Sequence, residues 1–156
     1  RPDERGDRPM SVPATFTLYQ YPETLAVVRL GVGAEVPAWA ESSSVFSVTV
    51  TATETSLICA ARSVPKKARH ERGFVAFEVQ GPLDFALTGV LVALLTPLAE
   101  EEISVFTQST FDTDWILVPQ QSAARAAEAW RRRGHHVTDA VPAAGGKQPS
   151  SRKSSS

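Results

Sequence analysis

The chain has 156 residues, with 16 lysines and arginines against 17 aspartates and glutamates, and its formal net charge is −1. This length suits one compact domain or two very small ones. The near-neutral charge argues against a nucleic-acid partner, because nucleic-acid-binding domains normally carry a basic stripe. The single cysteine, Cys59, excludes an intrachain disulfide framework and a cysteine-rich zinc site, so we expect a cytoplasmic protein. Since no apolar run reaches the roughly 18–20 residues of a membrane span, we expect no membrane partner either.

The two ends of the chain differ in composition from the middle. Residues 1–14 are expected to form a disordered leader, in which Met10, the only methionine, marks the natural start. Residues 142–156 are expected to be a disordered tail, because they hold no bulky apolar side chain that would offset the entropy of ordering. This basic, serine-rich tail is either a solvated terminus or a phosphorylation or docking site.

Residues 15–72 predict a small, strand-rich unit with little helix. Alternating apolar and polar residues at 46–51, a turn at 53–55 and a second apolar run at 56–61 predict a β-hairpin. The other elements expected here are two separate short strands, a stub of helix and a polar, weakly helical connector, at residues 16–20, 25–30, 36–40 and 66–71.

Residues 73–141 predict a more complete unit. Its expected elements are a strand, a helix, two strands, a helix and a last strand, at residues 74–79, 88–102, 103–109, 115–118, 122–133 and 135–141. This βαββαβ order is that of the ferredoxin-like fold. We therefore expect an α+β protein of two ferredoxin-like units in tandem, the first one shortened, with antiparallel sheets and the helices on one face.

The two predicted helices carry recognisable end signals. Thr88 and Ser122 are candidate N-caps, since their hydroxyls can accept hydrogen bonds from unpaired amides of a first turn. Gly134 is placed to end the second helix, because glycine readily adopts the left-handed conformation found there.

The most unusual polar stretch joins two predicted strands at residues 109–114. Ser109, Thr110, Thr113 and two carboxylates, Asp112 and Asp114, can all form hydrogen bonds there. An amine or guanidinium group would suit either carboxylate. The alternative is an ordinary β-turn, in which Asp and Thr side chains bond to the local backbone.

A second candidate stretch, residues 81–89, connects a strand to the start of a helix. Gly81 lets the backbone turn, and a helix N-terminus presents unpaired N–H groups that can hold a carboxylate. The alternative is a plain strand–helix connection. In the ferredoxin-like order, this stretch and residues 109–114 need not lie at the same edge of the sheet.

Readings as an enzyme or a metalloprotein are disfavoured. Cys59 lies in an apolar run, where a buried, inert thiol is expected rather than a nucleophile assisted by His70. His135 and His136 are neighbours on a predicted strand, so with Asp139 they would not chelate one metal ion. We expect no cofactor, since no nucleotide-binding or hydrolase motif occurs in the sequence.

Three segments together resemble the ACT domain family. They are FSVTVTATETSLICAARSVP, GPLDFALTGVLVALLTPLAEE and ISVFTQSTFDTDWILV, at residues 46–65, 81–101 and 103–118. Within that family, the pattern is similar to small proteins with two ACT-type units in one chain, such as the cytosolic arginine sensors, and to the regulatory domains of aspartate kinases. The sequence is half the length of those sensors, so the resemblance implies that a complete site can require a second chain.

The resemblance implies a non-catalytic regulatory protein that binds a small ligand, an amino acid, as a homodimer and acts on a protein partner. Asp114 would receive the ligand's cationic group and backbone amides at 83–87 its carboxylate. From the first unit, Ser56 and the Cys59 strand would line the opposing wall. The other ligand contacts implied are Gly81, Pro82, Leu83, Asp84, Phe85, Ser109, Thr110 and Thr113. An interaction module or regulatory subunit without its own ligand is the rival interpretation.

Overall fold

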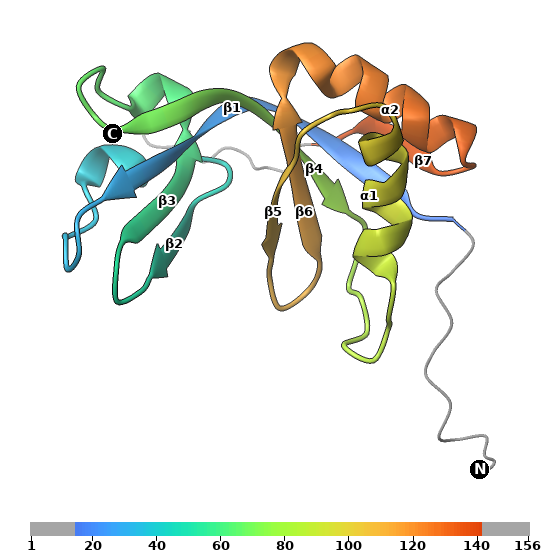
Figure 1. Ribbon diagram of the computed structural model, residues 1–156, viewed down its shortest axis with the longest axis horizontal. Helices are drawn as coiled ribbons and strands as arrows, with labels where there is room; N and C mark the ends of the chain where they lie inside the picture. Colours follow the sequence, from blue (N-terminus) through green and yellow to red (C-terminus); the bar gives the residue numbers. More distant parts are fainter. Residues whose placement is uncertain (1–14, 142–156) are drawn as a thin grey trace, which may run out of the picture.

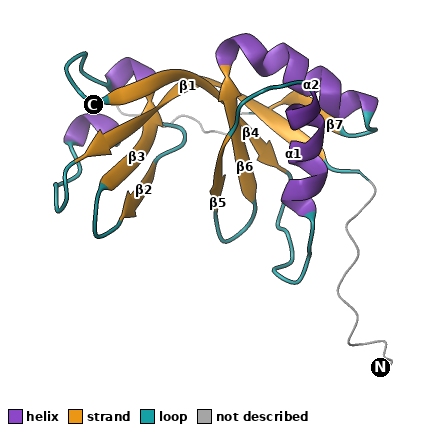
Figure 2. Ribbon diagram, viewed as in Figure 1, coloured by secondary structure: helices purple, strands orange, loops and turns teal. Residues whose placement is uncertain are grey.

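The computed structural model describes residues 15–141, so the predictions made for residues 1–14 and 142–156 lie outside the described residues. Seven strands and two α-helices are connected by short loops and three 3₁₀ turns (Figures 1 and 2). The strands are β1 (Thr17–Leu30), β2 (Ser47–Val50), β3 (Thr55–Ala60), β4 (His70–Val79), β5 (Phe106–Ser109), β6 (Asp114–Pro119) and β7 (His136–Asp139). The helices are α1 (Val90–Glu100) and α2 (Ala123–Arg132), and the 3₁₀ turns are η2 (Ala38–Ala40), η3 (Ala61–Ser63) and η4 (Gln120–Ser122).

All seven strands belong to one sheet, which is curled. Its order is β2-β3-β1-β4-β6-β5, and β7 pairs in parallel with the start of β1. The other pairings are antiparallel. Figure 1 shows the β2–β3 and β5–β6 hairpins extending to the same side of the long strands β1 and β4. The predicted α+β class, with antiparallel strands and helices on one face, is confirmed, as are both hairpins, but the strands form one sheet where separate sheets were expected.

Strand β1 corrects the prediction of two separate short strands. It runs unbroken through Tyr21-Pro22-Glu23, and its register against β4 shifts between Gln20 and Thr24. Pro22 lies within this irregularity, where a residue without an N–H group interrupts no ladder hydrogen bond. The expected gap between the two short strands is therefore a bulge within a single strand.

The predicted connector at residues 66–71 is also wrong in part. Only a turn follows Pro65, with the Ala68 N–H donating to the Pro65 carbonyl at 3.0 Å. Strand β4 begins already at His70, because the segment from His70 pairs with the second half of β1. The strand expected at 103–109 is shorter than predicted, since Ile103 turns into the core before β5 starts at Phe106.

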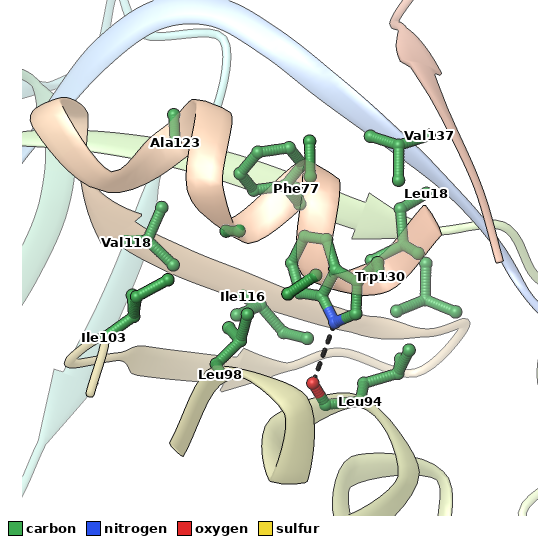
Figure 3. Close-up of a cluster of buried hydrophobic side chains, with 14 of the residues drawn as sticks. Leu18, Phe77, Leu94, Leu98, Ile103, Ile116, Val118, Ala123, Trp130 and Val137 are labelled. Atoms are coloured by element: carbon green, nitrogen blue, oxygen red, sulfur yellow. Dashed lines mark hydrogen bonds between the residues drawn. The ribbon is translucent and has the colours of Figure 1, made fainter. Parts of the chain in front are cut away.

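The main core lies between α1, α2 and the sheet. Trp130 of α2 is fully buried, and its indole Nε1–H donates to the Leu94 carbonyl of α1 at 2.8 Å (Figure 3). Its ring meets that of Phe77 edge-on, with centroids 4.9 Å apart. Leu18 of β1 and Val137 of β7 close the same cluster. This core fixes the position of α1 on the sheet, and therefore of the loop that leads into α1.

Two further apolar clusters serve the other parts of the sheet. One packs β1 and β3 against η2 and η3 and includes the buried Cys59. The other lies on the sheet face opposite the helices and includes Leu25, Ile58, Ala76 and Leu117, which are at most 3% exposed. No helix of residues 15–141 covers this second face, so its burial follows from the curl of the sheet.

The helix ends agree with the sequence only in part. Gly134 follows α2 at φ +92°, as predicted. Thr88 is not the N-cap of α1: Gly89 takes that position in a left-handed conformation, φ +79°, which needs no side chain. Ser122 occupies the N-cap position of α2 but forms no capping hydrogen bond, because the chain enters α2 through η4 with helical backbone angles.

Candidate functional site

The two polar stretches singled out in the sequence, the 81–89 loop and the 109–114 turn, lie against each other. The Leu83 N–H donates to the Asp112 carbonyl at 2.7 Å. Gly81 allows this approach, because a Cβ atom at its position would lie 2.9 Å from the same carbonyl oxygen and 3.1 Å from Cβ of Thr113. The buried Thr113 hydroxyl donates to the Val79 carbonyl at 2.5 Å, which ties the turn to the end of β4.

The 109–114 turn closes the β5–β6 hairpin. Ser109 and Asp114 form its last cross-strand pair, and the Ser109 hydroxyl donates to Oδ1 of Asp114 at 2.7 Å. The Thr110 hydroxyl donates to the Thr113 carbonyl at 3.1 Å, and the Thr113 N–H donates to the Thr110 hydroxyl at 3.3 Å. The two threonine hydroxyls therefore build the turn, while the half-buried Asp114 carboxylate is held by Ser109 and keeps acceptor capacity.

Between the loop and the turn lies a cavity of about 350 Å³, here called the loop–turn cavity. Three carboxylates, Asp84, Asp112 and Asp114, line it, and no basic residue does. Its lining residues are Leu83, Asp84, Phe85, Leu87, Gly89, Val90, Leu91, Val92 and all six residues of the 109–114 turn.

The loop amides that were expected to receive a carboxylate are largely occupied. The Ala86 N–H donates to Oδ1 of Asp84 at 2.7 Å, and the Leu87 N–H to the Asp84 carbonyl at 3.0 Å. The Leu83 N–H is also occupied, as described above, so this expectation needs correction. The donors available instead are at the start of α1, where Val90, Leu91 and Val92 line the cavity and helical bonding begins only with Ala93 N–H to the Gly89 carbonyl.

Two phenylalanines stand at the rim of the loop–turn cavity. Phe85 is 75% exposed and Phe111 80% exposed, and their rings meet edge-on with centroids 5.0 Å apart. Sequence reasoning missed Phe111 as part of the cavity, although it did single out the N-terminus of the helix that follows the 81–89 loop. The position of Phe111 between Thr110 and Asp112 was visible, but its contact with Phe85 depends on the pairing of two distant segments.

The remaining predicted contacts lie elsewhere in the chain. Gly81 and Pro82 line a neighbouring depression of about 340 Å³ that also includes Tyr19 and Glu78. Ser56, on β3, lines a third depression together with Arg29 and Phe106. The structure therefore brings Leu83, Asp84, Phe85, Ser109, Thr110, Thr113 and Asp114 together in one cavity, and it leaves Ser56 apart.

The residues that were considered for catalysis or metal binding are buried or are bonded to other groups of the fold, apart from the exposed His136 and Asp139. Cys59 is fully buried, and burial raises the pKa of its thiol, which disfavours the reactive thiolate. The His70 ring bonds through Nδ1 to the Ala68 carbonyl at 2.6 Å and accepts the Arg72 Nε–H at 3.1 Å. His135 is buried while His136 is exposed. Over residues 15–141, no three His, Cys, Asp or Glu side chains are grouped as metal ligands would be.

Comparison with protein families identifies two matching segments. Residues 69–132, which contain the loop–turn cavity, match the family model of the ACT domain. Residues 23–67 match a second family model, described as an N-terminal domain. No curated protein matches the sequence. None of the helices in residues 15–141 is long and apolar enough to cross a membrane.

Several solved structures share the fold. A protein of Agobacterium tumefaciens is 29% identical, with a TM-score of 0.76 over 83% of this chain and 97% of that chain. A Vibrio cholerae protein of unknown function, named as a possible transport protein, is 16% identical, with a TM-score of 0.63 over 77% of this chain and 91% of that chain. The allosteric aspartate kinase of Clostridium acetobutylicum is 10% identical, with a TM-score of 0.60 over 83% of this chain and 36% of that chain. The resemblance to ACT domains and aspartate kinases inferred from the sequence is thereby confirmed at the level of the fold.

Proposed function

We propose that this chain is a non-catalytic regulatory protein that binds an amino acid in the loop–turn cavity and communicates the bound state to a protein partner. The ACT match over residues 69–132 and the fold shared with an allosteric aspartate kinase support a regulatory role. Ligand binding would act by favouring one of two arrangements that the partner distinguishes.

The observation that carries this proposal is that two kinds of polar group line one cavity. One kind is the carboxylates of Asp84, Asp112 and Asp114. The other kind is the first residues of α1, where unpaired N–H groups and the helix dipole favour a negative group. An α-amino acid presents an ammonium group and a carboxylate on adjacent atoms, and a volume of about 350 Å³ accommodates a molecule of that size.

The division into units and the assembly state form part of the same proposal. We take residues 15–72 and 73–141 as two ACT-type units, similar in plan to the cytosolic arginine sensors, and expect a cytoplasmic homodimer. The outer edges of β2 and β5 pair with no other strand of residues 15–141, so a second copy can extend the sheet at either edge. Ser56, which lies outside the loop–turn cavity of its own chain, would then contribute from a second copy.

A thermal-shift screen of the full chain against the common amino acids, one at a time, tests the proposal. A ligand at 100 times its dissociation constant adds about 2.7 kcal/mol to the free energy of unfolding, which is a readily measured shift of the midpoint. We expect Asp114→Asn to abolish that shift, because the amide keeps the shape and the bond to Ser109 but removes the charge. Asp139→Asn, at an exposed position on β7, is the matched control and should keep the shift. A shift retained in Asp114→Asn, or no shift with any amino acid, would contradict the proposal.

The alternative of an interaction module without a ligand is favoured by the exposed Phe85–Phe111 pair. Two aromatic rings that are 75% and 80% exposed are a recognisable contact surface for another protein. This alternative expects no amino-acid shift, and it expects self-association in sedimentation experiments to be lost when both phenylalanines are replaced by serine. An amino-acid shift that survives the double substitution would argue against it.

A further inference from the structure

The depression that Ser56 lines, of about 390 Å³, lies on the sheet face opposite the helices. Its residues come from β1, β3, β4 and β5, from Glu54 in the turn before β3 and from Arg69 just before β4. The β2–β3 and β5–β6 hairpins flank the β1–β4 pair at its two edges (Figure 1). We call this depression the hairpin groove. Its lining residues are Val27, Val28, Arg29, Glu54, Ser56, Arg69, His70, Glu71 and Phe106.

Two of the polar residues in the hairpin groove are already engaged within the fold. The Arg29 guanidinium donates to the Thr53 carbonyl at 3.0 Å and to the Leu30 carbonyl at 3.3 Å, and it lies 4.0 Å from the Glu54 carboxylate. The His70 ring uses both nitrogens, one toward the Ala68 carbonyl and one toward Arg72. These groups support the groove and offer little binding capacity of their own.

The groove also contains one cation, Arg69, and one anion, Glu71, whose side chains have no bonding partner among residues 15–141. Neither side chain forms a hydrogen bond or an ion pair with another group of the described residues 15–141, and both residues are exposed. The Arg69 carbonyl accepts the Arg29 N–H at 2.9 Å, which fixes this part of the chain beside β1. Residues two apart on an extended chain point to the same side, roughly 7 Å from each other. The groove therefore presents a positive and a negative group side by side.

The wall next to these charges is apolar. Val27 lies directly across from Glu71 in the β1–β4 register and is half-buried. Phe106, 36% exposed, packs on Phe74 with ring centroids 6.4 Å apart and so presents a fixed apolar surface. A ligand with one carboxylate, one ammonium and an apolar remainder matches all three features.

We propose that the hairpin groove is a second ligand site, which binds an α-amino acid with an apolar side chain. Arg69 holds the carboxylate, Glu71 holds the ammonium, and Val27 and Phe106 contact the side chain. This site shares no lining residue with the loop–turn cavity, so the proposal does not depend on binding there.

Calorimetric titration of the full chain with leucine tests the site. We expect leucine to bind, and we expect leucinamide, N-acetylleucine and glycine to bind at least tenfold more weakly, because each lacks one of the three recognised groups. Arg69→Gln and Glu71→Gln should each weaken leucine binding at least tenfold. Lys67→Gln is the matched control for Arg69→Gln, since it removes a cation from the same exposed turn without touching the groove, and it should leave the affinity unchanged.

Several results would overturn the proposal. One is the absence of leucine binding, and another is an equal loss of affinity in Lys67→Gln and Arg69→Gln, which would show only a general effect of charge. If Asp114→Asn removes leucine binding while Arg69→Gln does not, leucine occupies the loop–turn cavity, so the groove proposal fails and the proposed function stands. If Arg69→Gln removes all binding while Asp114→Asn has no effect, leucine occupies the hairpin groove and the groove proposal stands; the loop–turn cavity is then tested by the screen with the other amino acids. An unchanged thermal midpoint of each variant without ligand confirms that the fold is intact.

Discussion

His135 is buried, and its imidazole ring must be neutral to accept its hydrogen bond. Its Nδ1 accepts the Phe16 N–H at 3.0 Å, and the two rings lie 5.7 Å apart. Burial lowers the pKa of His135 below its ordinary value, and the neighbouring Arg133 and His136 lower it further. A protonated ring could no longer accept the Phe16 N–H, so protonation removes the hydrogen bond that joins the start of β1 to the end of α2.

The first prediction is therefore a loss of stability in mild acid. Because the folded-state pKa of His135 lies below the unfolded value of about 6.5, the unfolded chain binds the proton more tightly. This contribution to the free energy of unfolding is complete above about pH 6.5 and is lost as the pH falls toward the lower folded-state pKa. Urea unfolding at pH 7.5, 6.5 and 5.5 measures it.

The matched variants are His135→Gln and His136→Gln. The glutamine amide can still accept a hydrogen bond but does not titrate, so the stability difference between native chain and His135→Gln should shrink as the pH falls. His136 is exposed, and His136→Gln should keep the acid sensitivity of the native chain, because His135 is still present. Parallel curves for the native chain and His135→Gln would assign the acid sensitivity to another group.

Side-chain roles could be predicted from the sequence where they depend on neighbouring residues in the chain. The burial of Cys59 followed from the apolar residues on either side of it. The Thr113 hydroxyl, by contrast, bonds to the Val79 carbonyl, 34 residues earlier, and no local pattern contains that information. Thr88 carries a good capping side chain, but Gly89 next to it provides a left-handed turn that makes the cap unnecessary.

At the scale of elements, the contact between the 81–89 loop and the 109–114 turn depends on Gly81. A Cβ atom at this position would meet backbone, the Asp112 carbonyl at 2.9 Å, which cannot rotate away as a side chain does. We expect Gly81→Ala to cost about 1–3 kcal/mol of stability, a typical cost of overpacking. The variant should also weaken the binding of any ligand in the loop–turn cavity. Chemical unfolding measures the loss of stability, exchange of the Leu83 amide, which bonds to Asp112, reports the loosened contact, and the amino-acid thermal-shift screen measures the effect on binding.

Gly31→Ala is the control for this substitution. A Cβ atom at Gly31 would meet no atom within 4 Å. Gly31→Ala therefore makes the same change of residue type as Gly81→Ala but creates no clash. We expect Gly31→Ala to leave the stability within about 0.5 kcal/mol of the native chain, as exposed substitutions usually do. Equal losses in the two variants would show that the close approach of loop and turn is unimportant.

The types of the secondary-structure elements were largely predictable from the sequence, but their first and last residues were not. Both expected helices are present, and Gly134 identified the end of α2. The expected break between residues 20 and 25 is absent. Pro22 falls where the β1–β4 register shifts, and a register is set by pairing between strands rather than by either strand alone.

At the scale of the whole molecule, strand β1 joins the two halves of the sheet. Its second half pairs with β3, most of its residues pair with β4, and its first half also pairs with β7. A ferredoxin-like βαββαβ unit formed by residues 73–141 alone would place its last strand beside its first. Here β1 lies between β4 and β7 instead. The sequence order could not predict this insertion, because β1 and β7 are separated by most of the chain.

The last prediction follows from this shared strand: residues 69–141 should not fold on their own. Without β1, strand β4 loses a neighbour and β7 loses the strand with which it pairs. The main core would also lose Phe16 and Leu18, and each buried side chain of this kind contributes about 1.5–3 kcal/mol. These losses are a large share of the 5–15 kcal/mol that stabilises a typical domain. We expect no cooperative thermal transition for the 69–141 fragment and a cooperative one for residues 15–141, both followed by circular dichroism. A cooperative transition in the shorter fragment would instead show that the two units are separable domains.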